Sequence, residues 1–117
     1  MMMANTRDFQ VKTSSEVVTI LSGQTTSGSI DLHGTSLIAI ITPSVLTGTV
    51  IRFKGSIDVT LFNDMYDSGG LEITIDVGTD RYIPLNVIDD FKGVRFLKLV
   101  SNQSEADDRN ITLVLRY

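Results

Sequence analysis

The stretch Leu71-Glu72-Ile73-Thr74-Ile75-Asp76-Val77 alternates apolar and polar residues without interruption. Successive side chains of a β-strand point to opposite sides of the sheet, so this alternation gives the strand one apolar and one polar face. A two-faced strand is typical of an antiparallel sheet that covers a core on one side only. The stretch therefore predicts a strand with these residues toward the core: Leu71, Ile73, Ile75 and Val77.

The same period of two recurs along the chain and predicts further strands. In residues 50–54, Ile51 and Phe53 are expected to face inward, with Arg52 and Lys54 outward. Strands are also predicted at residues 17–21, 29–32 and 59–62. Residues 111–117 alternate in the same way, with these side chains expected inward: Ile111, Leu113, Leu115 and Tyr117.

Two segments depart from simple alternation. Residues 37–41 are apolar at every position, which indicates a central strand covered on both faces. In residues 94–100 the phase changes, because Arg95 and Lys98 have opposite parity. A β-bulge near Phe96 or Leu97 would reconcile the two, and so would burial of both faces at that point.

Turn-forming residues separate these segments, and short strands at a spacing of about 8–12 residues are typical of a β-sandwich or barrel. One helical turn is expected, capped by Asn86 and ending at Gly93. The sequence before Val17 has no strong period. We therefore expect an extended N-terminal arm over residues 1–15 and one β-domain over residues 16–117.

Composition excludes several classes of protein. The 117 residues are enough for one domain, and the absence of cysteine excludes disulfides and cysteine–zinc sites. A net charge of −4 disfavours nucleic-acid binding, which depends on clustered Lys and Arg. No apolar run approaches the roughly 20 residues of a membrane span, so no membrane partner is expected.

The search for chemistry predicts no catalytic, cofactor-binding or metal-binding residue, and so predicts that the chain is not an enzyme. The single histidine, His33, stands beside a glycine turn, and base catalysis needs a positioned partner. Sequence-adjacent carboxylates such as Asp64 and Asp67 are better explained as soluble loop residues than as a glycosidase pair. A structural calcium is a minor alternative, with these candidate ligands: Asp76, Asp80, Asp107 and Asp108.

The aromatic residues leave a second kind of function open. Phe53, Phe62, Phe96 and Tyr117 fit core positions, whereas Tyr66 and Tyr82 lie near turns. Exposed rings near polar loops can stack on sugars, so a carbohydrate-binding module is one possible function.

Two segments resemble parts of discoidin-like jelly rolls. Residues 53–67 resemble the hairpin of that architecture, and residues 81–85 with 94–101 resemble its Arg-Tyr strand region. The resemblance covers about residues 28–117 and departs at Asp58-Val59, where the family has glycine after the aspartate. It implies an all-β, two-sheet antiparallel sandwich of jelly-roll type.

The segment from Arg81 to Arg116 also resembles the C-terminal ending of small virion-associated proteins of tailed phages, through its RYIPL, GVRFLKLVS and ITLVLR motifs. This resemblance implies a virion structural protein, made in the host cytoplasm, that acts as a capsid decoration or cement protein. Its expected partners are the major capsid protein and further copies of the chain, with a trimer favoured. The alternative to this assembly role is a carbohydrate-binding module of a phage fibre or an enzyme.

An extended arm suits such a role, because strand addition to a neighbour supplies backbone hydrogen bonds. The candidate partner-binding residues are Arg7, Phe9 and Val11 in the arm, together with Tyr66 and Tyr82 in the domain.

Overall fold

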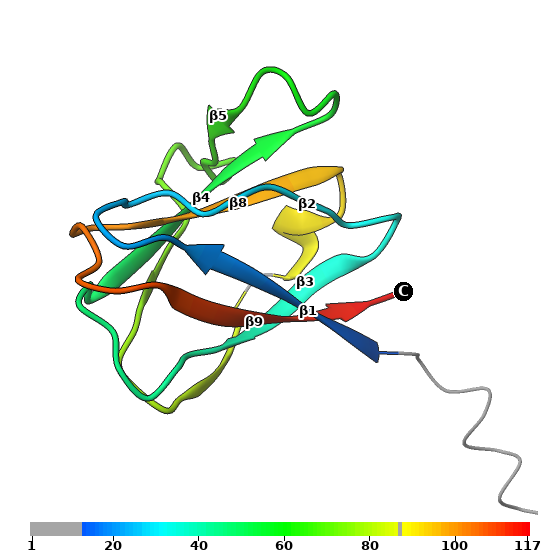
Figure 1. The fold of residues 1–117 in the computed structure, drawn as a ribbon. Coiled ribbons are helices and arrows are strands. Elements are labelled where there is room, and N and C mark those ends of the chain that lie inside the picture. The colour runs from blue at the N-terminus through cyan, green and yellow to red at the C-terminus, as the bar shows by residue number, and fades with distance from the viewer. Residues whose placement is uncertain (1–12, 87) are drawn as a thin grey trace, which may run out of the picture.

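Nine strands and one short 3₁₀ helix form the described part of the chain, residues 13–86 and 88–117, in a computed structural model (Figure 1). The strands form two antiparallel sheets that pack face to face, which confirms the predicted all-β sandwich. The first sheet has the order β1 (Thr13–Ile20), β9 (Arg109–Arg116), β3 (Ser36–Ile41) and β7 (Tyr82–Pro84).

The second sheet has the order β2 (Ile30–Asp31), β8 (Phe96–Ser101), β4 (Val50–Ser56) and β5 (Asn63–Asp64), with β6 (Thr74–Asp76) also paired to β4. β5 pairs with the end of β4 and β6 with its beginning, so the two occupy the same side of that strand. Strands that follow one another in the chain largely alternate between the sheets. Strand orders of this kind are typical of jelly rolls.

The period of two correctly predicted which side chains fill the core. Ile51 and Phe53 of β4 are fully buried, and so are Ile111 and Leu113 of β9 on the opposite sheet. The 3₁₀ helix η1 (Ile88–Phe91), within the predicted helical turn, places the Phe91 ring edge-on to Phe53, with ring centroids 5.0 Å apart. The helix therefore closes one end of the space between the sheets.

Four predictions about strands and their inward residues are wrong. Residues 59–62 form a loop that precedes β5, and the strand predicted at 71–77 is ordered only as Thr74–Asp76. Leu71 is exposed because it lies in the turn between β5 and β6, and Tyr117 is exposed because β9 ends before it. Alternation reports which side chains share a face, but not whether the opposite sheet extends far enough to cover them.

The phase change in residues 94–100 begins just before β8, where Arg95 N donates to Ser56 O although Ser56 is the register partner of Phe96. Two successive residues thus face Ser56, as in the predicted bulge near Phe96, and the end of the strand is buried on both faces. β8 keeps an unbroken register with β4 from Phe96 to Ser101. Leu99 faces the other sheet, and the adjacent Val100, on the opposite face, is also buried and forms an isolated bridge with Thr26. β3 is a central strand as predicted, although Ile38 and Ile41 are only half-buried.

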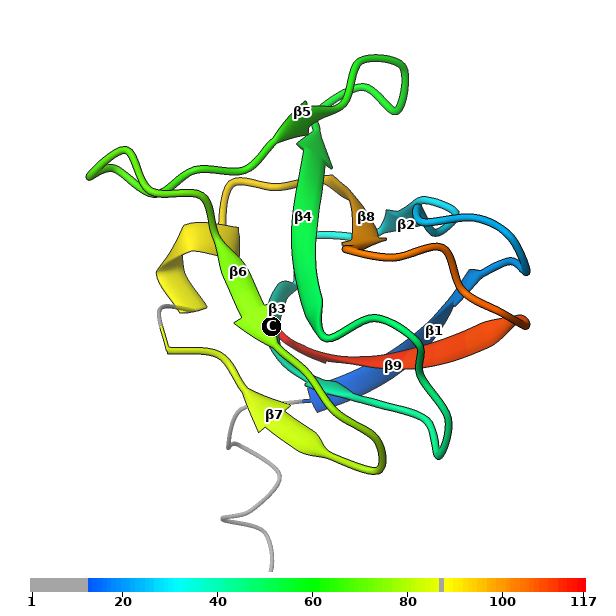
Figure 2. The same cartoon turned by 90° about the vertical axis from the view of Figure 1, so that its left-hand side faces the viewer.

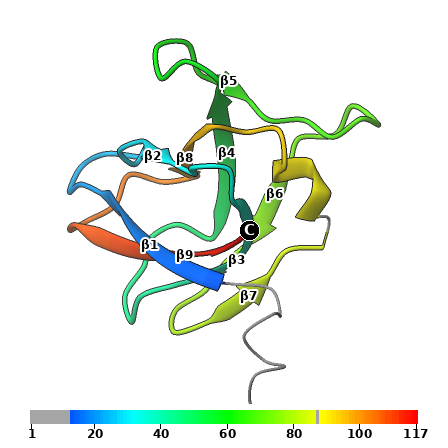
Figure 3. The same cartoon turned by 90° about the vertical axis from the view of Figure 1, so that its right-hand side faces the viewer.

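The two long sides of the sandwich differ. On the side of β1 and β2, shown in Figure 3, the segment between them closes the gap, since Gly28 N donates to Thr19 O and Ser27 N to Leu99 O. On the other side, shown in Figure 2, β6 and β7 are the edge strands of the two sheets. The predicted arm falls mostly on residues 1–12, outside the described residues. Its last three residues begin β1 and pair with β9.

Candidate functional site

The loop of residues 57–62, between β4 and β5, is held in one conformation by two polar side chains. The Asp58 carboxylate accepts hydrogen bonds from the backbone N–H groups of Thr60 and Leu61, each 3.0 Å long, and from the Ser56 hydroxyl. The Ser56 oxygen in turn accepts from the N–H groups of Asp58 and Val59. The Leu61 and Thr60 N–H groups and the Ser56 hydroxyl lower the pKa of Asp58, so it remains a carboxylate acceptor at neutral pH.

Val59 adopts a left-handed backbone conformation with φ of 64°. This region favours glycine, and a β-branched residue there is a true outlier because its side chain crowds the backbone. Valine thus stands in a backbone conformation that favours glycine. The hydrogen bond from its N–H to the Ser56 oxygen, and those from the next two N–H groups to Asp58, hold it there.

Three apolar side chains project from this fixed loop. Ile57 is 80% exposed, Val59 50% and Leu61 66%. We call these three residues the apolar tip; the loop that carries them projects from the end of the sandwich (Figure 1). Because most monomeric proteins keep large apolar side chains scattered, such a group on a locked loop is typical of an interaction surface.

The predicted site tyrosines are both exposed but belong to different parts of the fold. Tyr66 follows β5 and borders a pocket of about 520 Å³ that also includes Leu61, Asn63 and Asp64. Tyr82 lies on β7, in the first sheet, opposite Ile41. They belong to separate surfaces. The other predicted residues, Arg7, Phe9 and Val11, lie outside the described residues.

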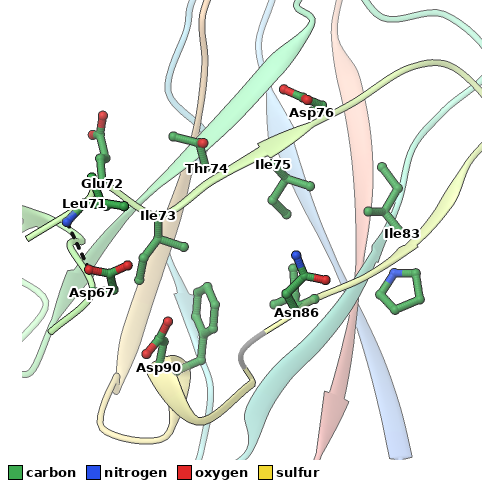
Figure 4. A pocket seen from close by; sticks show the side chains of 13 residues that line it. Asp67, Leu71, Glu72, Ile73, Thr74, Ile75, Asp76, Ile83, Asn86 and Asp90 are labelled. Carbon is green, nitrogen blue, oxygen red and sulfur yellow. Dashed lines mark hydrogen bonds between the residues drawn. The ribbon is translucent and has the colours of Figure 1, made fainter. Parts of the chain in front are cut away.

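A groove of about 490 Å³ lies between β6 and β7, on the open side of the sandwich (Figure 4). Its floor is apolar and half-buried, with Ile73, Ile75 and Ile83 pointing into it. Its lining also includes four carboxylates: Asp67, Glu72, Asp76 and Asp90. We call this the β6–β7 groove.

One polar cluster is structural and was missed by sequence reasoning. Glu105, only 1% exposed, accepts hydrogen bonds from the backbone N–H groups of Thr47 and Gly48 and from the Ser101 hydroxyl, at 2.8 to 2.9 Å. It also pairs with Arg109, whose Nε lies 3.0 Å from Oε1. The cluster ties the loop before β9 to the loop before β4. The Glu-x-x-x-Arg spacing within an acidic loop was the available signal.

The four aspartates named as possible calcium ligands do not form a cluster. Asp76 lies on the β6–β7 groove, while Asp108 accepts a hydrogen bond from Ser22 N at 2.8 Å. Within residues 13–86 and 88–117, no group of three or more His, Asp or Glu side chains could hold a metal ion. No helix in that part of the chain is long and apolar enough to cross a membrane.

His33 is an exposed turn residue, as its sequence context indicated, and its Nδ1 lies 3.7 Å from Asp31 Oδ2. Asp31 also forms a two-pronged pair with Arg95, with N–O distances of 2.9 and 3.0 Å. The Arg95 hydrogen bonds, helped by the His33 N–H, lower the pKa of Asp31 to about 2. Another outward cation, Lys54, pairs with Asp64 at 3.0 Å.

No protein-family model and no curated protein matches the chain. Among solved structures, the chain is similar to the SPBc2 prophage-derived protein YomS, with 10% identity and a TM-score of 0.48 over 91% of this chain and 96% of that one. It is also similar to the Yersinia pseudotuberculosis-derived mitogen, with 9% identity and a TM-score of 0.44 over 91% and 86% of the two chains. Likenesses of this size carry no argument about function.

Proposed function

We propose that this chain is a virion structural protein of a tailed phage, a non-enzymatic capsid decoration or cement protein that docks on the major capsid protein through its apolar tip. The observation that carries the proposal is the display of Ile57, Val59 and Leu61 on a loop fixed by Ser56 and Asp58. A preorganised loop loses little conformational entropy on binding, so its apolar contacts contribute more fully to affinity.

Val59 strengthens the argument. Glycine would fit its backbone conformation without strain, yet a branched apolar side chain stands there half-exposed. Because the Val59 side chain is half-exposed, its contacts within the fold offset little of that strain. Strained positions concentrate at binding sites, where a partner supplies the compensating contact.

The size of the tip favours an oligomer. Three side chains bury much less than the 1,200 Å² or so at which stable protein interfaces begin. Several tips on one particle-bound assembly would bind together and gain affinity through high effective concentration. A homo-oligomer, with a trimer favoured, therefore fits this mode of capsid binding better than a single copy.

The resemblance of residues 81–116 to small tailed-phage virion proteins supports the same proposal. This segment contributes β7, β8 and β9, which are strands of both sheets. The resemblance thus concerns the framework of the domain, while the apolar tip lies outside the segment.

The test is co-sedimentation of the purified chain with phage capsids that lack it. We expect the double variant Ile57→Asp, Leu61→Asp to bind at least tenfold more weakly than the wild type. The matched control is Val45→Asp, which also places a carboxylate at an exposed apolar residue but at the opposite end of β4. Equal binding by the double variant and the wild type would overturn docking through the tip, and failure of the wild type to sediment would overturn the capsid proposal.

A second candidate, a glycan-binding module, is favoured by the exposed Tyr66 ring in the pocket with Asn63 and Asp64. A ring with adjacent amide and carboxylate groups can stack on a sugar and bind its hydroxyls. On a glycan array, Tyr66→Ala would then abolish a signal that Tyr82→Ala leaves intact. Absence of any wild-type signal would reject this candidate.

A further inference from the structure

The β6–β7 groove is bounded by the edge strands of both sheets. β6 pairs only with β4 and β7 only with β3 among the described strands, so each has one side without a strand partner. An edge strand is a template for another extended chain, because its outward backbone groups lack sheet partners. The groove therefore offers backbone pairing along both walls.

The floor and rim of the groove specify the chemistry of an occupant. Ile73, Ile75 and Ile83 present a half-buried apolar floor to solvent. Of the rim carboxylates, Asp76 and Asp90 make no ion pair or side-chain hydrogen bond with any described residue. An extended segment with apolar side chains and a cation would satisfy both features.

The chain's own sequence contains such a segment. In Arg7-Asp8-Phe9-Gln10-Val11-Lys12, a strand would place Arg7, Phe9 and Val11 on one face. Residues 1–12 carry two cations and one carboxylate, a net side-chain charge of +1, so the remaining residues carry −4 − 1 = −5 of the total. The segment and the domain are thus complementary in charge as well as in pattern.

The segment cannot fill the groove of its own domain. Thr13 lies on β1, three strand spacings from β7, and at about 4.8 Å each this separation is about 14 Å. Val11 is two residues before Thr13 and can lie at most about 7 Å from it. Phe9 and Val11 can therefore enter a β6–β7 groove together only in another molecule.

We propose that the β6–β7 groove binds residues 7–11 of a second copy of this chain, added as a strand between the two sheet edges, with Phe9 and Val11 on the apolar floor and Arg7 at the acidic rim. The contact joins two different surfaces, so a closed ring such as a trimer satisfies every groove. The inference supplies a mechanism for the proposed homo-oligomer. It does not involve the apolar tip, and its test contains no capsids.

The first experiment measures the mass of the full chain by light scattering behind a sizing column. The wild type is expected to be oligomeric at micromolar concentration, and Phe9→Asp is expected to raise the dissociation constant at least tenfold. Arg7→Glu alone and the double rim variant Asp76→Lys, Asp90→Lys are each expected to weaken assembly. The variant that combines all three substitutions is expected to recover at least part of the lost affinity. Asp107→Lys, an exposed acid in the loop before β9, is the matched control and should assemble as the wild type does.

A second measurement keeps the proposal open to refutation if a variant folds poorly. A synthetic peptide of residues 5–12 is added to the full-length Phe9→Asp chain, and amide NMR shifts are followed. Shifts concentrated at β6 and β7 support the proposal. A monomeric wild type at 100 µM or so, a Phe9→Asp chain with wild-type mass, or peptide shifts elsewhere would each overturn it. If Phe9→Asp chains are monomeric but still bind capsids weakly, capsid docking stands independently of the groove.

Discussion

Replacement of Glu105 by alanine is the sharpest test of how this sandwich is held together. The substitution removes the acceptor of two backbone N–H groups and one hydroxyl, and it leaves Arg109 without its carboxylate partner. Arg109 is itself buried. The loop before β4 and the loop before β9 would then lose the side chain that links them.

The expected loss of stability follows from the removal of only one partner of a buried charge pair. Removal of one partner of such a pair costs about 3–5 kcal/mol, because the other charge remains buried without compensation. Typical domains have a free energy of unfolding of about 5–15 kcal/mol, so this change takes a large fraction of the total. With an m-value of about 1.5 kcal/mol/M, the urea midpoint should fall by about 2–3 M.

The assay is equilibrium urea unfolding followed by circular dichroism, with Asp107→Ala as the matched control. Asp107 is an exposed acid two residues away, and its loss should change the free energy of unfolding by less than about 0.5 kcal/mol. The double variant Glu105→Ala, Arg109→Met should be more stable than Glu105→Ala alone, since it removes the uncompensated charge. A Glu105→Ala chain within 1 kcal/mol or so of the wild type would refute the argument.

The same residue makes a pH prediction. Burial raises the pKa of Glu105, but the Thr47 and Gly48 N–H groups, the Ser101 hydroxyl and Arg109 outweigh it and hold the pKa below the ordinary 4.5. A carboxyl group whose pKa is lowered by folding stabilises the fold fully above its unfolded-state pKa, and this contribution is lost as the pH falls through the folded-state value. Below pH 4.5 the wild type should therefore lose stability more steeply than Glu105→Gln in urea titrations at successive pH values.

Three further outcomes follow from local geometry. Val59→Gly should raise the free energy of unfolding by about 1 kcal/mol, since relief of left-handed strain exceeds the added chain entropy; an unchanged or lower urea midpoint would contradict the strain. Gly48→Ala should cost about 1–3 kcal/mol, because its Cβ would lie 2.0 Å from the Ser101 hydroxyl oxygen, and a neutral effect would show that the hydroxyl moves freely. Asp31 should remain ionised at pH 3 in carboxyl NMR, because its pKa is lowered from 3.8 to about 2, and Arg95→Gln should move this pKa back toward the ordinary value. The ion pair of Asp31 with Arg95 stabilises the fold fully above pH 3.8, and this contribution is lost as the pH falls toward 2. An Asp31 that titrates normally in the wild type would argue against the pair in solution.

Strands with one face buried along their whole length could be predicted from the sequence. In β4 and β9, alternation correctly identified the inward residues Ile51, Phe53, Ile111 and Leu113. The signal weakened wherever local surroundings differ from an ideal two-faced strand. Val100 is buried although it lies on the outer face of β8, and at Leu71 the chain leaves the sheet for a turn.

The candidate sites depended even more on tertiary structure. No local pattern shows that β6 and β7, although consecutive in the chain, end as edges of different sheets with a groove between them. Residues 59–62 gave an apolar pattern that predicted a strand, and only the backbone showed that Val59 adopts a left-handed conformation in a loop. Glu105 looked like one more acid of a soluble loop, although it is the most deeply buried of them.

The sequence by itself determined the class of this protein: a period of two gives strands, and the spacing of turns gives a small all-β domain. Periodicity is a property of neighbouring residues, so it survives without knowledge of the rest of the chain. The tertiary structure alone decided which faces are covered, which sheet edges remain open and which carboxylate is buried. Those properties depend on residues far apart in sequence, and their free energies come from solvent exclusion by the assembled sheets.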